Sequence, residues 1–159
     1  MKNLETTLLV IVKDNKIMLG EKKRGFGKGK FNAVGGKRQE GELIYDTMLR
    51  ETMEEIGVKP IDAQIVGIIN FKLFIDGEKA SEKMHIFLAS DYEGEPIESD
   101  EMKPEWFDIN NIPYDKMFED DMLWLPKVLN GNKVKAEVEF DENFSMLSQK
   151  FEVVNELKY

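Results

Sequence analysis

The stretch "GKRQEGELIYDTMLRETMEEIGV", from Gly36 to Val58, carries the strongest structural signal in this 159-residue sequence. Within it, Leu43 to Ile56 has uncharged side chains at four-residue intervals along one side, which predicts a helix. Glu51 then lies on the same face as Glu54 and Glu55, because residues three and four positions apart are neighbours on a helix. The stretch therefore predicts a helix that carries three carboxylates close together.

Three carboxylates held together raise one another's pKa unless a cation lies between them. Their hard oxygen atoms suit Mg²⁺, with Mn²⁺ as the alternative, and such ions also bridge substrate phosphates. A metal there would neutralise phosphate charge, orient an attacking water and stabilise the departing oxygen. The other interpretation is a solvated acidic face of the helix, which is the commoner arrangement of glutamates.

The spacing of the whole stretch resembles the Nudix box. After Gly36 come five residues, then Glu42, then seven residues and "RETMEEIGV", so every charged and glycine position of the box is present. Thr52 alone departs, at a position where the box usually has an apolar residue. The resemblance implies an α/β chain with the Nudix fold, an α/β/α sandwich with a mixed β-sheet, and hydrolysis of a diphosphate linkage.

The resemblance also implies roles for individual residues. The implied metal ligands are Glu51, Glu54, Glu55, Glu101 and the backbone carbonyl of Gly35. Arg50 is expected to pair with a neighbouring glutamate and to fix its side chain, so it joins the three helical glutamates in the catalytic set. One of these glutamates or Glu101 serves as the general base, although a surface loop acid is the other interpretation of Glu101.

Three further segments resemble one branch of the Nudix family. They are "LGEKKRGFGKGKFNAVGGKRQEGE" (19–42), "ESDEMKPEWFDINNIPYDKMFEDDMLW" (98–124) and the carboxyl-terminal end. The branch is that of the oxidised-purine nucleoside triphosphatases, the animal type of 8-oxo-dGTP diphosphatase, which are MutT-like. This implies hydrolysis of 8-oxo-dGTP and 2-hydroxy-dATP to monophosphate plus pyrophosphate, which sanitises the nucleotide pool.

Matching positions in that branch imply a substrate-binding pocket. Its members are Thr7, Lys22, Phe26, Asn32, Val34, Gly35, Gly36, Lys37, Phe118, Asp120, Asp121 and Trp124. A purine needs an aromatic wall, which Phe26, Phe118 or Trp124 would provide, and stacking is worth ~1–3 kcal/mol per base. Asn32 offers a donor and an acceptor to a mixed base edge, and Lys22 offers a point charge to the sugar or phosphates.

Two adjacent acids, Asp120 and Asp121, lie between aromatic residues in "MFEDDMLW". Two carboxyl groups in an enclosed apolar slot do not both ionise easily, so we expect this pair to retain one proton near neutral pH. The protonated acid would donate to the purine O6, and its partner would accept from N1–H or the amino group. The alternative role is to cap the following helix, and both roles can coexist.

Four positions depart from that branch of the family. Phe31 and Phe118 stand where the branch usually has tryptophan, and Glu119 replaces a proline. Glu82 falls near a position where relatives place an apolar pocket residue. These departures bear on base preference and leave the reaction class unchanged.

The remaining sequence predicts further strands and a second helix. Strands are expected over Thr7 to Val12, Lys16 to Gly20, Phe31 to Val34, Ala63 to Ile75, Met84 to Ser90, Glu105 to Ile109, Lys133 to Phe140 and Met146 to Val154. The second helix is expected over "DDMLWLPKVLNG", beginning at an acid that caps it. Residues 1–159 are expected to form a single domain.

Composition and charge exclude several classes of protein. The net charge of −9 argues against a nucleic-acid coat, and no apolar run is long enough to span a bilayer. The absence of cysteine excludes disulfides and thiolate metal sites. We expect a cytoplasmic monomer whose partner is a small-molecule nucleoside triphosphate, with no nucleic acid and no membrane.

Two other functions remain open from the sequence. A Nudix hydrolase for another nucleoside diphosphate derivative, such as a dinucleotide, a nucleotide sugar or a capped RNA end, would carry the same box. A non-catalytic nucleotide-sensing module is the alternative from a different class, although a pure binder has little need for a repulsive cluster of glutamates.

Overall fold

The computed structural model describes residues 1–25 and 27–158. In chain order the elements are β1 (Lys2–Lys13), β2 (Lys16–Lys22), β3 (Phe31–Asn32), β4 (Val34–Lys37), α1 (Ile44–Ile56), β5 (Lys59–Ile61), β6 (Gln64–Ile75), β7 (Glu78–Ala89), β8 (Asp91–Glu93), β9 (Met102–Asp108), η1 (Tyr114–Lys116), α2 (Asp121–Leu129), β10 (Lys133–Phe140) and β11 (Met146–Val154). The predicted elements are present except that the strand expected over residues 31–34 is divided, while β5 and β8 form a small separate sheet that the sequence did not predict.

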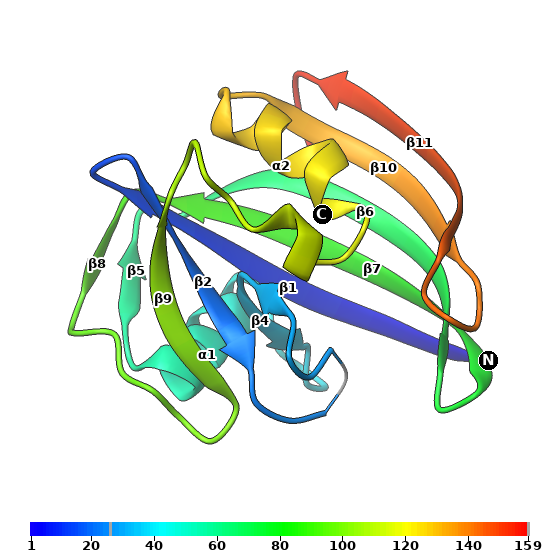
Figure 1. The fold of residues 1–159 in the computed structure, drawn as a ribbon, viewed down its shortest axis with the longest axis horizontal. Coiled ribbons are helices and arrows are strands. Elements are labelled where there is room, and N and C mark those ends of the chain that lie inside the picture. Colours follow the sequence, from blue (N-terminus) through cyan, green and yellow to red (C-terminus); the bar gives the residue numbers. More distant parts are fainter. Residues whose placement is uncertain (26, 159) are drawn as a thin grey trace.

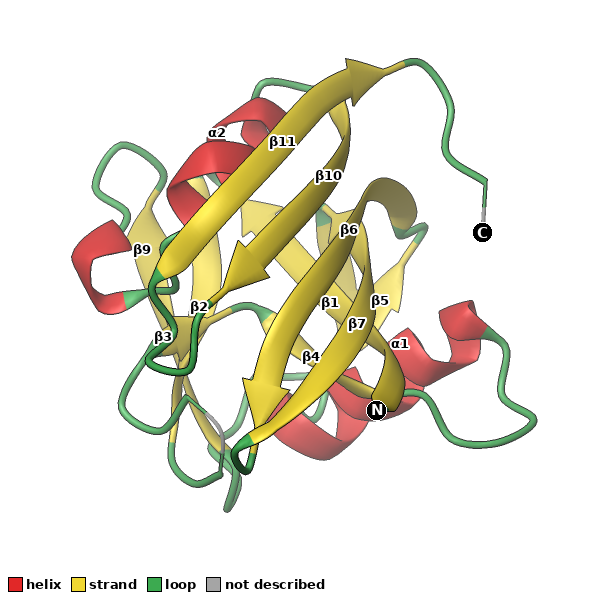
Figure 2. Cartoon of the chain, turned by 90° about the vertical axis from the view of Figure 1, so that its right-hand side faces the viewer, coloured by secondary structure: helices red, strands yellow, loops and turns green. Residues whose placement is uncertain are grey.

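The main sheet is mixed and has the strand order β11-β10-β6-β7-β1-β2-β3. Strand β7 runs parallel to β1, and β10 runs parallel to β6, whereas the other pairs are antiparallel. Figure 2 shows β10 and β11 extending the sheet beyond β6. The long strands β6 and β7 form the hairpin expected from Asp76 and Gly77, which both have positive φ.

Side chains alternate across β1, so each face of the sheet has its own core. Leu8 and Val10 belong to the core that includes Trp124 of α2, whereas Leu9 belongs to the core that includes Met48 of α1. Figure 1 shows α2 on the near side of the sheet and α1 behind β1. The expected α/β/α sandwich with a mixed sheet is therefore confirmed.

Helix α1 begins and ends close to the predicted residues. Gly57 follows Ile56 with φ 73°, and its N–H donates to the Met53 carbonyl, so the helix ends in the left-handed conformation that glycine permits. Thr52 is buried, but its hydroxyl donates to the Met48 carbonyl at 2.7 Å. That hydrogen bond explains how a polar residue occupies an apolar position of the box.

The strand expected over Phe31 to Val34 is instead two short strands that pair with different partners. Strand β3 pairs with β2, and β4 pairs with β1. Between them the Asn32 side chain accepts a hydrogen bond from the Ala33 N–H at 2.9 Å, which withdraws that donor from strand pairing. The break brings Gly35 and Gly36 beside β1.

The expectation that an acid caps the second helix is wrong for Asp120. This residue occupies the cap position of α2, but its backbone is helical and its side chain makes no capping hydrogen bond. Asp121 instead accepts a hydrogen bond from the Phe118 N–H at 3.0 Å, which fixes the turn before the helix. Both carboxylates are thus held by the turn and by the helix that follows it.

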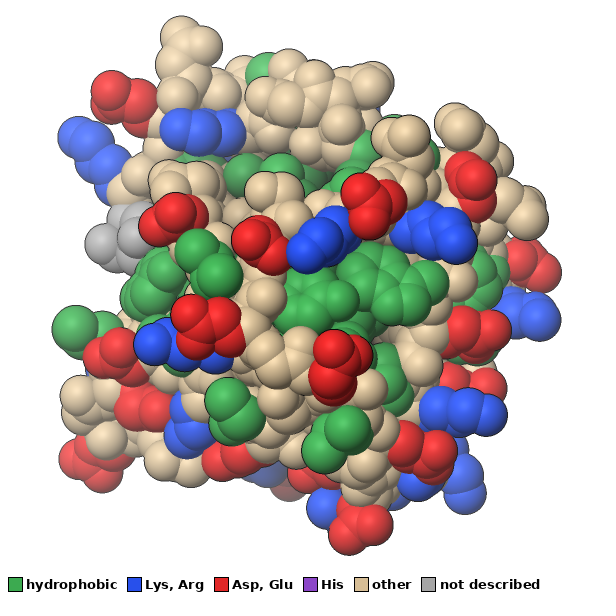
Figure 3. Space-filling model, turned by 90° about the vertical axis from the view of Figure 1, so that its left-hand side faces the viewer, with side chains coloured by type: hydrophobic (Ala, Val, Ile, Leu, Met, Phe, Trp, Pro, Cys, Tyr) green, Lys and Arg blue, Asp and Glu red, His purple; other side chains and the backbone are tan. Residues whose placement is uncertain are grey.

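The surface mixes charges of both signs. Figure 3 shows acidic and basic side chains interspersed over one face, with hydrophobic side chains visible near its centre. Among residues 1–25 and 27–158, no helix is long and apolar enough to cross a membrane.

Candidate active site

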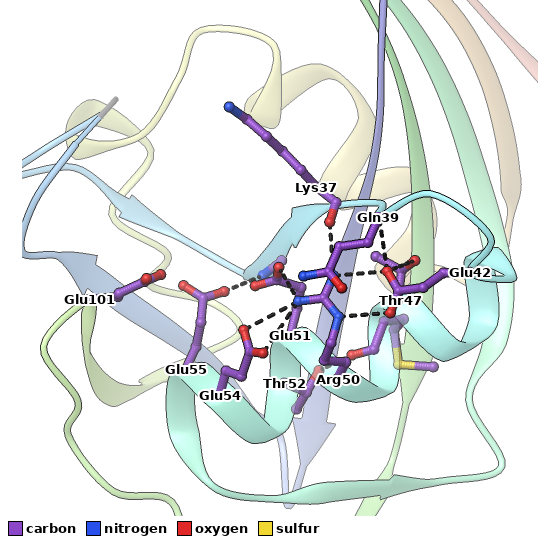
Figure 4. Close-up of polar contacts among 12 residues, drawn as sticks. Lys37, Gln39, Glu42, Thr47, Arg50, Glu51, Thr52, Glu54, Glu55 and Glu101 are labelled. Carbon is purple, nitrogen blue, oxygen red and sulfur yellow. Dashed lines mark hydrogen bonds and ion pairs between the residues drawn. The ribbon is translucent and has the colours of Figure 1, made fainter.

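The guanidinium group of Arg50 holds the charged residues of the box together (Figure 4). It donates to both carboxylate oxygens of Glu42, at 2.7 and 2.9 Å, and to Glu51 at 2.9 Å. It also contacts Glu54 at 3.3 Å and the Lys37 carbonyl at 2.9 Å. These hydrogen bonds confirm that Arg50 pairs with neighbouring glutamates, and the bond to Glu42 lowers the pKa of that carboxyl to about 2.

Two glycines are required because other groups occupy the space of their missing side chains. A Cβ atom on Gly36 would overlap the carboxylate of Glu51, and one on Gly35 would overlap the Thr7 carbonyl of β1. The Gly35 N–H donates to Glu55 at 2.9 Å. The structure adds a second reason for these glycines to the predicted approach of metal and phosphates, because Gly36 makes room for the Glu51 carboxylate and Gly35 makes room for β1.

Glu55 is buried on α1 with one oxygen satisfied and the other not. Its Oε2 atom has no hydrogen-bond partner among the described residues. Burial raises the pKa of Glu55 to about 7, and the charges of Glu51 and Glu101 add to that rise, while the Gly35 N–H and Lys22 oppose it. Burial likewise raises the pKa of Glu51, against the opposing charge of Arg50. A buried carboxylate oxygen without a partner is a position where a cation is favourable.

The predicted metal ligands lie around one place, although they do not converge into a complete site. Within the described ranges, no three acidic or histidine side chains are arranged to hold a metal ion. Arg50 engages Glu51 and Glu54, and Glu101 pairs with Arg24 at 3.3 Å. Carboxylate and carbonyl oxygens are nevertheless suitable ligands for a hard divalent cation. The Oε2 atom of Glu55 is available as such a ligand, because no described residue donates a hydrogen bond to it.

A cavity of about 250 Å³ connects this cluster with the acidic pair. Most of the predicted substrate-binding residues line it, namely Thr7, Lys22, Asn32, Gly35, Gly36, Lys37, Phe118, Asp120 and Asp121. Glu55 lines it as well, so the same cavity reaches the carboxylates of α1. The hydroxyl of Thr7 is buried and has no hydrogen-bond partner among the described residues, which leaves it available to a ligand.

Two of the predicted pocket residues are placed differently, and a third is not described. Trp124 is buried in the core beneath the cavity and does not line it, and its indole N–H donates to Asp120 at 3.1 Å. The side chain of Val34 is buried in the core on the α1 side of the sheet. Phe26 lies outside the described residues. Trp124 therefore orients a carboxylate rather than forming the expected aromatic wall.

Asp120 and Asp121 are both 3% exposed. Burial raises the pKa of Asp120 to about 7, and the charges of Glu82 and Glu119 add to that rise. Burial also raises the pKa of Asp121 well above its usual value, and the carboxylate of Asp120 contributes next. The raised pKa values of both carboxyls support the expectation that the pair retains a proton near neutral pH.

The sequence did not reveal several other residues that line the cavity. Phe71 and Phe140, from β6 and β10, stack with ring centres 6.0 Å apart, and Phe144 follows in the turn after β10. Lys30 lies 5.3 Å from the ring centre of Phe118. Alternation along β6 and β10 would have placed the first two on one face. Lys30 belongs to the basic loop of residues 22–30, which suggests an anionic ligand, but no local signal identifies Phe144.

Replacing Asp120 by asparagine is expected to raise stability more at about pH 8 than at about pH 5. The pKa of Asp120 is raised from 3.8 to about 7 in the folded state, so folding becomes less favourable as pH rises through that interval. The amide removes this cost and retains an oxygen that accepts the Trp124 N–H. Thermal unfolding at both pH values measures the difference in Tm. The exposed acid Asp115 provides a control through Asp115→Asn, and an equal Tm difference at both pH values would contradict the assignment.

The chain is similar in sequence and in fold to known proteins. The family model of the NUDIX domain matches residues 2–128. The chain is 42% identical over 151 residues to the oxidized purine nucleoside triphosphate hydrolase of Danio rerio, covering 95% of this chain and 96% of that protein. It is 39% identical over 142 residues to the protein of the same name from Mus musculus, covering 89% and 90%. The crystal structure of a MutT protein from Bacillus halodurans has a TM-score of 0.83 and 26% identity, covering 93% of this chain and 97% of that one.

Proposed function

Because the chain belongs to the Nudix hydrolase family, we propose that it hydrolyses oxidised purine nucleoside triphosphates to the monophosphate and pyrophosphate. The observation that carries the proposal is one cavity with two chemically different ends. We define the first end by Glu55 of α1, which accepts a hydrogen bond from Gly35 of β4, and the second by Asp120 and Asp121 at the start of α2, on the other face of the sheet. The first suits a metal-bound polyphosphate and the second suits the donors of a purine edge.

We propose Mg²⁺, with Mn²⁺ as the alternative, as the cofactor. The residues that would hold it are Glu51, Glu54, Glu55, Glu101 and the carbonyl of Gly35. When bound, the ion would neutralise phosphate charge and polarise the bond that breaks. Arg50 positions Glu51 and Glu54 through its hydrogen bonds to both carboxylates. Glu55 has a pKa near neutrality and is therefore our candidate for the base that accepts a proton from the attacking water.

The second end of the cavity would bind the base. Phe118 offers an aromatic face, and Asn32 offers a donor and an acceptor from β3. Asp120 and Asp121 would read the pairing edge, with one protonated acid donating and one carboxylate accepting. Lys22, which also lines the cavity, would contribute a positive charge near the sugar or phosphates.

We also propose that residues 1–159 form one domain and act as a monomer in the cytoplasm, on free nucleotides rather than on nucleic acid or a membrane. Strand β10 supports the single domain, because it lies beyond residues 2–128 and still pairs with β6 in the main sheet.

Competition between nucleotides tests the proposed function. With Mg²⁺ present, kcat/KM for 8-oxo-dGTP is expected to exceed that for dGTP by about tenfold or more, because a site built for particular donors rejects an analogue that lacks them. The value of kcat/KM for 2-hydroxy-dATP is expected to exceed that for dATP by a similar factor. Chromatography of the products is expected to show the monophosphate and pyrophosphate.

The same assay separates the alternatives. Removal of the divalent ion with EDTA is expected to abolish turnover, and added Mg²⁺ is expected to restore it. Preference for a dinucleotide, a nucleotide sugar or a capped RNA end would overturn the assignment of the substrate and retain the family. Binding of nucleotides without any metal-dependent turnover would indicate a sensing module instead.

A further inference from the structure

Glu82 is a carboxylate in an otherwise apolar row of the sheet. It lies on β7 between Leu4 of β1 and Phe71 of β6, and all three residues line the cavity. Residues directly paired across neighbouring strands point to the same face, so these side chains form part of one cavity wall. An apolar side chain would suffice for packing at this position, and an acid there calls for a polar partner.

The protein supplies only part of that partnership. The hydroxyl of Thr6 donates to Glu82 Oε2 at 2.7 Å. Among the described residues, no other side chain or backbone group donates a hydrogen bond to Glu82. Burial raises its pKa, and the charge of Lys37, which also lines the cavity, opposes that rise. Oε1 therefore remains available to a molecule in the cavity.

Glu82 also interacts electrostatically with Asp120, at the end of the cavity that we propose binds the base. Its charge contributes to the raised pKa of Asp120, so the two carboxyls are close enough to interact. They come from different elements, however, since Glu82 lies on the sheet and Asp120 lies in the turn before α2. A flat base that presents its pairing edge to Asp120 and Asp121 leaves another edge to face Glu82.

Oxidation of a purine at C8 changes that other edge. It places a carbonyl at C8 and turns N7 from a hydrogen-bond acceptor into an N–H donor. On the basis of the proposed function, we propose that Glu82 is a specificity-determining residue that accepts a hydrogen bond from the N7–H of an 8-oxopurine. An unoxidised purine would present its N7 lone pair to the same carboxylate, which is repulsive.

Substitution of Glu82 tests this role with substrates that differ in N7. Glu82→Gln and Glu82→Met are each expected to lower kcat/KM for 8-oxo-dGTP and 8-oxo-dATP by roughly tenfold or more. The same variants are not expected to lower kcat/KM for 2-hydroxy-dATP, which is oxidised but has an N7 lone pair instead of an N7–H, because loss of the carboxylate removes a repulsion rather than a hydrogen bond. The matched control is Glu78→Gln, an exposed acid on the same strand, for which no change is expected.

A role confined to structure gives a different pattern. If Glu82 only supported the strand through Thr6, both variants would weaken hydrolysis of all these substrates equally, and that result would overturn the proposal. Circular dichroism and Tm establish that the variants fold. Calorimetric measurement of the affinities for 8-oxo-dGMP and dGMP tests the role of Glu82 separately from the proposed hydrolysis. Loss of the preference for 8-oxo-dGMP in Glu82→Met supports the role of Glu82 even without hydrolysis, and an unchanged preference refutes it.

Discussion

Replacing Glu55 by glutamine is expected to lower kcat by about 10²- to 10⁴-fold, the range that a positioned acid or base contributes. The amide keeps the size of the side chain and an oxygen that accepts the Gly35 N–H. It loses the negative charge on Oε2, the buried oxygen that has no hydrogen-bond partner among the described residues. Steady-state kinetics with 8-oxo-dGTP in saturating Mg²⁺ measures the effect.

The fold is expected to survive that substitution. The pKa of Glu55 is raised to about 7 by burial, so an amide that cannot ionise is not expected to lower Tm at about pH 8. Asp46→Asn, which changes an exposed acid on the same helix, is the control and is expected to retain turnover. Near-normal turnover of Glu55→Gln would refute the proposed role of Glu55.

Replacing Asp121 by asparagine is expected to lower kcat/KM for 8-oxo-dGTP by roughly 10- to 100-fold, the scale of a lost hydrogen bond to a charged group. Asp121 is buried and lines the cavity, so its carboxyl has no solvent to replace a missing ligand contact. The amide also prevents the pair from moving its proton, so the ratio between 8-oxo-dGTP and 2-hydroxy-dATP is expected to change. Asp120→Asn is expected to alter that ratio as well.

Glu119→Gln is the matched control for the acidic pair. Glu119 immediately precedes Asp120 but is exposed, and its carboxylate accepts a hydrogen bond from the Met146 N–H at 3.2 Å rather than lining the cavity. Its charge makes the smallest of the named contributions to the raised pKa of Asp120, so its loss is expected to leave hydrolysis of both substrates nearly unchanged. If Asp120→Asn and Asp121→Asn also left both activities unchanged, the shared-proton hypothesis would be wrong.

The two ends of the cavity have a common physical character. Glu55 at one end and the pair Asp120 and Asp121 at the other are buried acids whose pKa is raised chiefly by burial. Such groups weaken folding at neutral pH, since the unfolded chain ionises more readily than the folded one. Their retention in one cavity is typical of a site where binding a cation or a base offsets that cost.

The sequence by itself determined the features that depend on local spacing. Helical periodicity placed Glu51, Glu54 and Glu55 together, and Gly57 marked the end of α1. The bounds of β10 and β11 followed from alternation between turn residues. The resemblance to the Nudix box identified the family because its spacing lies within one short segment.

Only the tertiary structure decided how distant segments combine. It placed Trp124 beneath Asp120 instead of against the base, because the indole packs in the core on the α2 side of the sheet. It showed why Gly36 has no side chain, since the carboxylate of Glu51 occupies that space. It paired Thr6 with Glu82, 76 residues apart. Such contacts follow from strand register and from packing between layers, which no local pattern of residues encodes.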